Sequence, residues 1–293
     1  MQDERHFRAE EGNLESPQSP MGSRRAATPS GMGLETPKSA DDTSAGAYAP
    51  SQHRHTVVPP SRWGVTLDQL DALLREVEKR YPDVDPTVYT VVNEIIKPMT
   101  EKAGCSYALM LNPNGVDAEN FVTHAWGEGF KAFVGDLRKA NVSGGFWICF
   151  LANPQTWEPS ELKALLGVNP FMSPFHAALT EASKVVAVRN SNLNMYTRLW
   201  CVFELWAANE KNKEVIVVGP NPESIDPGRT GYNATCFDER DTQMLRQAID
   251  ARGKKKRVNM YVGSVMFADS AAEPDPEPVA APAAAPVESE VPL

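Results

Sequence analysis

The sequence predicts an α/β domain built around a parallel sheet that is buried on both faces. From Phe121 onward, short runs of apolar and β-branched residues alternate with helical stretches. Continuous apolar strands of this kind are typical of parallel sheets covered by helices on both sides. The segment 63–269 is also long enough to form one such domain with a substantial core.

The two ends of the chain differ in composition from its middle. Residues 1–62 are rich in Ser, Pro, Gly, Ala and charge, and residues 270–293 contain Ala, Pro and Glu but no basic residue. Neither end has a hydrophobic period, so neither can offset the entropy lost on ordering. We therefore expect two disordered tails around a single domain at 63–269.

The domain is expected to open with a helical extension over residues 63–104. In its first helix the apolar residues share one face: Leu67, Leu70, Leu74 and Val77. Thr66 and Gln69 have the spacing of a capping box at its start. A second helix is expected with Asp85 as its N-cap and Gly104 at its end.

The sheet follows this extension. We expect a hairpin strand over Ser106–Leu111, closed by turn residues at Asn112–Gly115. The expected parallel strands are Phe121–His124, Phe146–Leu151, Val185–Val188 and Val215–Val218. The expected helices are a segment carrying Phe130 and Leu137, Glu161–Leu166, Pro174–Ala182 with Ser173 as N-cap, the segment after Thr197, Asp241–Ile249 and the apolar stretch Val258–Phe267. This succession is flavodoxin-like.

Ligands of such folds bind beyond the carboxyl ends of the parallel strands. This rule selects residues that follow three strands: His124, Trp126, Gly127 and Glu128 after the first, Asn153, Pro154 and Gln155 after the second, and Arg189 and Asn190 after the third. Several of them have a structural alternative. His124 could be a hydrogen-bonded structural residue, Trp126 could anchor its loop, the two amides could cap theirs, and Arg189 could be a surface charge.

Glu204 is notable because it is a carboxylate within an apolar helical segment. The inward face of this segment carries Leu199, Val202, Phe203 and Trp206, and Thr197 is its expected N-cap. Trp200 lies one turn before Glu204, so we expect the carboxylate to sit beneath an indole. The alternatives are a surface glutamate at a helix flank and a tryptophan that belongs to the core.

Two segments resemble the Toll/interleukin receptor (TIR) domain, in a divergent form of the kind found in protists and algae. Phe121–Glu128 (FVTHAWGE) is similar to the first TIR strand and its loop. Arg198–Leu205 (RLWCVFEL) resembles the plant-type segment in which Trp-Cys precedes Glu-Leu by two residues. The resemblance covers residues 120–220. It departs at Gly129, where many TIR domains keep an acidic residue, and at Leu151–Gln155, which replaces an Arg-Asp…Pro-Gly loop.

The resemblance implies that Glu204 is the catalytic residue for cleavage of NAD, because active TIR domains use the glutamate of this segment. Breaking the nicotinamide–ribose bond produces an oxocarbenium-like state, which a nearby carboxylate stabilises. Trp126 or Trp200 would stack on a base or on nicotinamide, and Arg189 would meet a phosphate. NAD would be a substrate, with no permanently bound cofactor, in intracellular signalling.

Two other classes of function remain open. The domain could be a non-enzymatic signalling scaffold that self-associates or docks other signalling proteins, or a transferase that exchanges nucleoside bases. A Glu204 sealed by its neighbours, or tied to Arg198 or Arg189, would favour the scaffold.

Several features argue against other functions. The cysteines at 105, 149, 201 and 236 lack metal-ligand spacing, so we expect reduced thiols and no metal site. Cys201 lies in an apolar helix, which argues against a nucleophile pair with His124. There is no leader-like segment and no apolar run of about 18 residues, so a cytoplasmic protein without membrane contact is expected. The basic run Lys254–Arg257 is expected to be a solvated loop, and no nucleic-acid binding is predicted for a chain of net charge −9.

Overall fold

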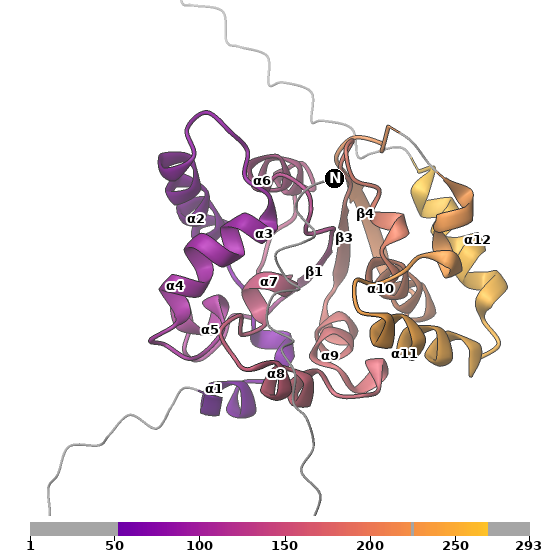
Figure 1. Ribbon diagram of the computed structural model, residues 1–293, viewed down its shortest axis with the longest axis horizontal. Coiled ribbons are helices and arrows are strands. Elements are labelled where there is room, and N and C mark those ends of the chain that lie inside the picture. Colours follow the sequence, from indigo (N-terminus) through magenta and orange to yellow (C-terminus); the bar gives the residue numbers. More distant parts are fainter. Residues whose placement is uncertain (1–51, 224–225, 269–293) are drawn as a thin grey trace, which may run out of the picture. The chain divides into compact units, whose positions relative to one another are not determined.

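The computed structural model describes residues 52–223 and 226–268 (Figure 1). The chain divides into two units, 1–45 and 46–293, and every described residue belongs to the second. The predicted tails therefore lie outside the described residues over 1–51 and 270–293. Residues 52–62, which the sequence assigns to the first tail, are described and helical in part.

The centre of the domain is a parallel sheet of four strands in the order β2-β1-β3-β4. The strands are β1 (Asn120–Thr123), β2 (Phe146–Ile148), β3 (Lys184–Val188) and β4 (Glu214–Val218). This confirms the α/β class, and the strand order is flavodoxin-like. The chain winds from β1 to β2 on one side and returns to β3 on the other. The boundary between β1 and β3 is thus the topological switch point.

Helices cover both faces of the sheet (Figure 1). The N-terminal helices are α1 (Gln52–Val57), α2 (Leu67–Arg80), α3 (Val88–Val91), the π-helical segment η3 (Val92–Ile96), α4 (Lys97–Thr100) and α5 (Tyr107–Leu111). The later helices are α6 (Phe130–Arg138), α7 (Cys149–Ala152), α8 (Pro159–Leu166), α9 (Pro174–Glu181), α10 (Leu199–Glu210), α11 (Glu239–Asp250) and α12 (Lys255–Met266). None of the described helices is long and apolar enough to cross a membrane.

The core follows the alternation of side chains along the strands. Val122 and Val186 face one side of the sheet and pack with apolar residues of α2, α3 and α6. Their neighbours Phe121 and Val185 face the other side, where α9 and the end of α10 cover them. Ala187 continues this second side and packs beneath α10, α11 and α12. Both faces of the sheet are therefore buried, as the apolar strands predict.

Two predicted helix caps are present. Thr66 and Gln69 form the reciprocal capping box of α2, and the Ser173 hydroxyl accepts from the backbone N–H of His176 at the start of α9. A third cap differs from the prediction. Thr197 donates its hydroxyl to the carbonyl of Asn194 at 2.7 Å, and α10 begins at Leu199 with Arg198 in the cap position.

Three predicted elements are corrected. Ser106–Leu111 is not a strand, because the Ser106 hydroxyl caps a short helix, α5, by accepting from the Leu109 N–H at 3.2 Å. The second parallel strand ends at Ile148, and the apolar residues after it turn into α7. The predicted N-terminal tail extends too far. The indole of Trp63 donates to the carbonyl of Val58 at 2.8 Å, which fixes the segment after α1 against the domain.

Asp85 caps a different helix from the predicted one. The second helix of the extension begins after Thr87, whose hydroxyl accepts from the Thr90 N–H. The Asp85 carboxylate instead accepts from the backbone N–H groups of Lys131 (2.8 Å) and Ala132 (3.0 Å) in the first turn of α6. The N-cap of α6 is Gly129, and a Cβ there would lie 2.2 Å from Asp85 Oδ2. A side chain at 129 would therefore displace the carboxylate.

The extension also covers one edge of the sheet. β2 is an outer strand, and Val65 pairs with Phe146 on its open side in antiparallel fashion. The Val65 N–H donates to the Phe146 carbonyl at 3.0 Å, and the Phe146 N–H donates back at 2.8 Å. The backbone groups of β2 at this position are thus satisfied on both sides.

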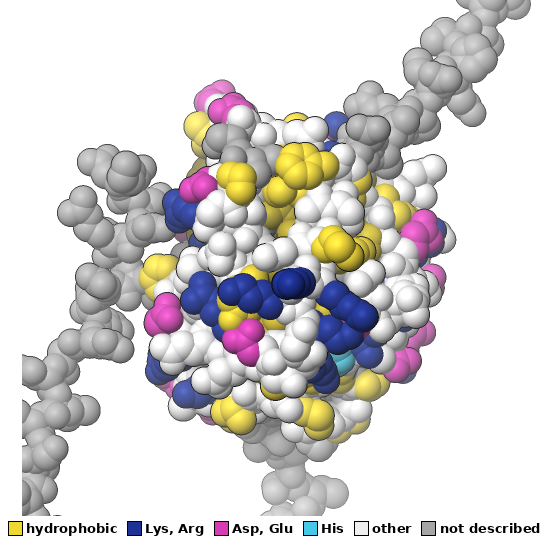
Figure 2. Space-filling view, turned by 90° about the vertical axis from the view of Figure 1, so that its right-hand side faces the viewer, with side chains coloured by type: hydrophobic (Ala, Val, Ile, Leu, Met, Phe, Trp, Pro, Cys, Tyr) yellow, Lys and Arg dark blue, Asp and Glu magenta, His cyan; other side chains and the backbone are white. Residues whose placement is uncertain are grey.

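The basic run Lys254–Arg257 is not a loop. Lys254 occupies the N-cap position of α12, and the next three residues form its first turn. Figure 2 views the side of the molecule on which α11 and α12 lie, and a band of Lys and Arg side chains crosses it.

Candidate functional site

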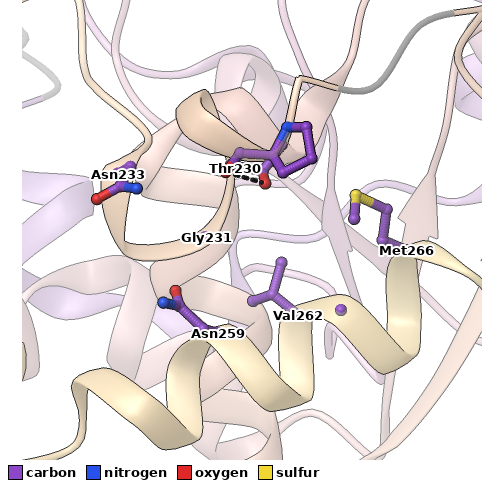
Figure 3. A pocket seen from close by; sticks show the side chains of 8 residues that line it. Thr230, Gly231, Asn233, Asn259, Val262 and Met266 are labelled. Carbon is purple, nitrogen blue, oxygen red and sulfur yellow. Dashed lines mark hydrogen bonds between the residues drawn. The ribbon is translucent and has the colours of Figure 1, made fainter.

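A notch lies between the loop 227–233 and α12, with a volume of about 160 Å³ (Figure 3). Thr230, Asn233 and Asn259 contribute polar atoms to its wall, and Val262 and Met266 contribute apolar ones. None of the site residues predicted from the sequence lines this notch. They lie mainly at the carboxyl edge of the sheet.

The end of β1 holds α10 in place. The Cys201 thiol donates to the carbonyl oxygen of His124 at 3.2 Å, which attaches the first turns of α10 to the residue after β1. Glu204 follows one turn later and is 6% exposed. Its carboxyl group faces Thr123, the last residue of β1. The structure therefore brings Glu204 to the end of the first strand.

Burial raises the pKa of Glu204 to about 8. The Thr123 hydroxyl opposes this rise in pKa only partly, because its Oγ1 is buried and makes no hydrogen bond of full geometry. Within the described part of the chain, no cation forms a salt bridge with Glu204, and the guanidinium of Arg189 donates to other groups. At neutral pH the carboxyl group is therefore mainly protonated.

His124 and Glu128 form a second buried pair. The distance from Nδ1 to Oε1 is 2.8 Å, and each side chain is 1% exposed. Burial lowers the pKa of His124 to about 3. Burial, together with the charges of Asp136 and Asp85, raises the pKa of Glu128 well above its usual value. Both pKa shifts favour the neutral forms of the pair. In that state Nδ1 accepts from a protonated Oε1, since a proton on Oε2 has no partner.

Cys149 lies at the other ring nitrogen of this histidine. His124 Nε2 is 3.5 Å from its sulfur, and the indole N–H of Trp126 donates to the same sulfur at 3.0 Å. The row Glu128–His124–Cys149 has the order of a nucleophile triad. The positions of the protons argue against that role. In the neutral pair the imidazole proton is on Nε2, so this nitrogen cannot accept a proton from the thiol. Burial also raises the pKa of Cys149 to about 12, so the thiol stays protonated. The row is a hydrogen-bond network that fixes the loop after β1.

We call Thr123, His124, Glu128, Cys149, Cys201 and Glu204 the carboxyl-edge cluster. Sequence reasoning selected His124, Glu128 and Glu204 and considered Cys201 beside His124, but it missed Thr123 and Cys149. The only signal for Cys149 was its position at the end of an apolar strand. Within the described residues, no group of three or more His, Cys, Asp or Glu side chains is arranged to hold a metal ion.

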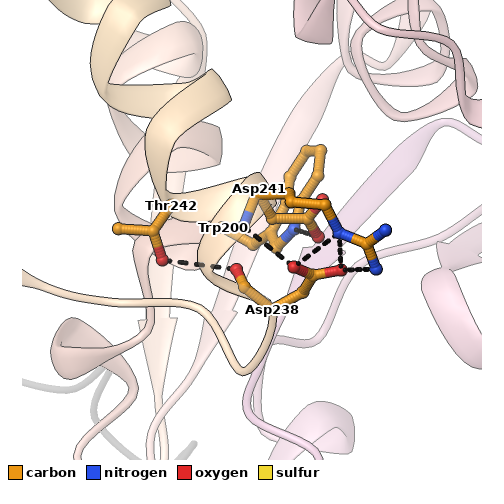
Figure 4. A network of polar contacts seen from close by, with 5 residues as sticks. Trp200, Asp238, Asp241 and Thr242 are labelled. Atoms are coloured by element: carbon orange, nitrogen blue, oxygen red, sulfur yellow. Dashed lines mark hydrogen bonds and ion pairs between the residues drawn. The ribbon is translucent and has the colours of Figure 1, made fainter. Parts of the chain in front are cut away.

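Trp200 is used in packing rather than as a cover for Glu204. Its ring stacks on Phe175 with centroids 5.1 Å apart and planes 22° from parallel. Its indole N–H donates to Asp241 Oδ2 at 3.0 Å, beside Asp238, which caps α11 (Figure 4). These contacts join α10 to α9 and α11. They correspond to the alternative in which Trp200 is a core aromatic.

Arg189 is neither a surface charge nor open to a phosphate. It is 1% exposed, and its guanidinium donates to the carbonyls of Ala268 (3.0 Å) and Gly219 (3.2 Å) and to the side chain of Asn221. It therefore ties the residue after α12 to the ends of β3 and β4. The alternative of a surface charge is therefore wrong, because the side chain turns inward from the end of the strand.

The other residues predicted to contact a ligand make contacts within or between the loops instead. Asn153 donates to the carbonyl of Cys149 at 2.9 Å, and Gln155 donates to the carbonyl of Asn153 at 3.1 Å. Gly127 touches the loop after β3, since a Cβ at this position would lie 2.9 Å from Leu193 Cδ2. The loops after β1 and β3 thus meet at the switch point. Of the predicted residues, His124, Trp126, Glu128 and Glu204 are gathered around the carboxyl-edge cluster.

Comparison of the chain with protein-family models, with curated proteins and with solved structures finds no match.

Proposed function

We propose that this domain binds a nicotinamide nucleotide and cleaves its nicotinamide–ribose bond, with Glu204 as the catalytic carboxyl group. The observation that carries the proposal is a carboxyl group of raised pKa, without a salt bridge, at the switch point of a parallel sheet. The fold gains no evident stability from such a group, because its ionised form is costly to bury. Function is the simplest reason for its presence.

The chemistry follows from the charge of the substrate. A cationic nicotinamide ring beside Glu204 favours the ionised carboxylate and lowers its pKa. When the bond breaks, its electron pair moves to the ring nitrogen, so nicotinamide leaves as a neutral molecule. The positive charge then resides on the ribose, where the carboxylate stabilises it. Water adds to this carbon and releases one proton.

The resemblance to TIR domains supports the same assignment, and Asp85 adds to it. Gly129 stands where many TIR domains keep an acidic residue, and the Asp85 carboxylate fills the space of a side chain at this position. A carboxylate is therefore present there, although it comes from the extension. This domain would act in intracellular, cytoplasmic signalling, with NAD as its substrate.

Access to Glu204 requires a movement of the loops. The carboxyl group is 6% exposed, and the loops after β1 and β3 meet at Gly127 and Leu193. In this proposal, a nucleotide enters when these loops separate, and Trp126 of the first loop stacks on one of its rings. Arg189, Asn153 and Trp200 have other partners and are not part of the pocket.

Turnover of NAD by the purified full chain tests the proposal. We expect Glu204→Gln and Glu204→Ala to lower kcat by about 100-fold or more, while Glu101→Gln, at an exposed position, leaves it unchanged. For the wild type, kcat/KM should rise with pH up to about 8, as Glu204 ionises in the free protein. NAD that stays intact even at high protein concentration would rule out the enzyme.

A non-enzymatic scaffold is the second candidate. It is favoured by the closed site, in which Glu204 is buried and the Trp200 indole and the Arg189 guanidinium donate to other groups of the fold. A scaffold of this kind would act by self-association or by docking other signalling proteins. Sedimentation of the full chain over a range of concentrations, together with intact NAD, would support it. Exchange of bases in a nucleoside panel would instead indicate a transferase.

A further inference from the structure

The side of the molecule on which α11 and α12 lie carries a band of Lys and Arg side chains (Figure 2). We call it the basic face. Its members are Lys211, Arg246, Arg252, Lys254, Lys255, Lys256 and Arg257. Acidic side chains also lie on this side: Glu210 pairs with Lys254 at 3.4 Å, Asp250 accepts from the Tyr232 hydroxyl at 2.6 Å, and Glu239 and Asp241 are in the first turn of α11. The excess is local, because the net charge of the chain is −9.

Aromatic rings hold some of these cations in place. The Arg252 guanidinium lies 3.3 Å from the ring centroid of Phe171. Tyr232 is flanked by Lys255 at 4.2 Å and Arg246 at 5.8 Å. Cations ordered in this way lose less conformational entropy when a partner binds.

Of the four consecutive cations at the start of α12, Lys254 pairs with Glu210 and Lys255 covers Tyr232, but the fold does not account for Lys256 and Arg257. Positive charges in the first turn of a helix oppose its dipole and destabilise it. Lys256 and Arg257 are exposed, and within the described part of the chain neither has a salt-bridge partner. A role outside the folding of this domain would explain their position.

The notch of Figure 3 lies between the loop 227–233 and α12, and the first turn of α12 belongs to the basic face. Its lining residues Gly231 and Asn233 flank Tyr232, whose ring Lys255 covers. Asn259 gives the wall a polar rim, and its Oδ1 accepts from the Tyr232 N–H at 2.8 Å. The volume of about 160 Å³ is enough room for one side chain, and Val262 and Met266 give the notch an apolar part.

We propose that this surface binds an acidic peptide segment of a partner protein, with one apolar side chain of the peptide in the notch and its carboxylates on the basic face. A nucleic acid fits the surface less well. The net negative charge of the chain repels a long polyanion, and the rings of Phe171 and Tyr232 are covered by cations rather than open for base stacking.

Fluorescence anisotropy with the full chain tests whether the cations of the basic face bind the peptide. The probe is a labelled synthetic peptide of Asp and Glu residues with one central Leu. We expect binding that weakens with salt and is about tenfold weaker in the double variant Lys255→Glu/Lys256→Glu. The matched control is Lys79→Glu/Lys102→Glu, which reverses two exposed lysines in the extension. An equal loss of binding in both variants overturns the proposal.

The notch is tested separately. Gly263 lines it, and a Cβ at this position has no heavy atom within 4 Å. Gly263→Leu should therefore fold and fill the notch. We expect Gly263→Leu to weaken binding of the Leu peptide several-fold, so that its affinity equals that of a peptide with Ser in place of Leu. Gly263→Ala should change the affinity for the Leu peptide little. Equal affinity for the Leu and Ser peptides in the wild type overturns the role of the notch. Tighter binding of a single-stranded oligonucleotide or an anionic vesicle than of the peptide overturns the choice of partner.

Discussion

The carboxyl-edge cluster and the basic face handle charge in opposite ways. In the cluster, burial keeps Glu204 and Glu128 protonated and His124 and the thiols neutral at physiological pH. On the basic face, seven cations remain in contact with solvent, which screens them. Properties of the first region should therefore depend on pH, and properties of the second on salt.

Removing the ionisable group at position 204 should have the largest effect on stability. The pKa of Glu204 is about 8 in the folded chain, against 4.5 for a glutamate in water. Between these values the folded state keeps a proton that the unfolded state has lost, so the free energy of unfolding falls by about 1.4 kcal/mol per pH unit as pH rises. Glu204→Gln should remove this slope, as measured by urea unfolding at several pH values. If the variant keeps the same dependence of unfolding free energy on pH, the pKa of Glu204 is not raised, and its carboxylate lies in a polar environment.

The Glu128–His124 pair provides the next test. Glu128→Ala leaves the buried Nδ1 of His124 without a partner and should lower the free energy of unfolding by about 1–3 kcal/mol. Glu128→Gln should cost much less, because its amide can donate to Nδ1 as the carboxylic acid does. Urea unfolding at pH 7 measures both. If Gln costs as much as Ala, the pair is an ion pair and the cluster is not neutral.

A smaller effect is expected where the two regions are joined. Trp200 on α10 donates to Asp241 on α11, so this bond links the helix of Glu204 to the basic face. Trp200→Phe retains stacking on Phe175 and loses the bond, which should cost about 1 kcal/mol of unfolding free energy. Neither the pH dependence of stability nor peptide binding should change. A shift in either would mean that the regions are coupled.

The smallest expected change in the free energy of unfolding is an increase. Lys256→Glu places a negative charge in the first turn of α12 and should raise stability by about 0.3–1 kcal/mol at low salt. Thermal unfolding at low and high salt measures it, and the gain should diminish when salt is added. A loss of stability would show that Lys256 has a favourable partner in the fold.

Local signals predicted much of the architecture. The capping box at Thr66, the cap at Ser173 and the four apolar strands could be recognised because each depends on neighbouring residues. Tyr107–Leu111 could not, since five apolar residues fit a strand as well as a helix, and the Ser106 cap decided between them. The end of the second strand was missed for the same reason.

The candidate site was harder to predict because its partners are distant in sequence. The strand-end rule placed His124 and Trp126 at the carboxyl edge, but Cys149 joins them only through the pairing of β1 with β2. Arg189 and Trp200 were given to a ligand because their partners, Ala268 and Asp241, lie 79 and 41 residues further along the chain. A pattern read within one segment could not identify them.

The pairing of Val65 with Phe146 has a consequence for dissecting this chain. An outer strand with free backbone groups is a template for pairing with other molecules, and β2 is protected at this position by two hydrogen bonds from the extension. A shortened chain that begins at residue 105 would lose this protection together with the Asp85 cap of α6. Such a fragment should aggregate through β2. The extension therefore keeps the domain from aggregating, in addition to forming part of its core.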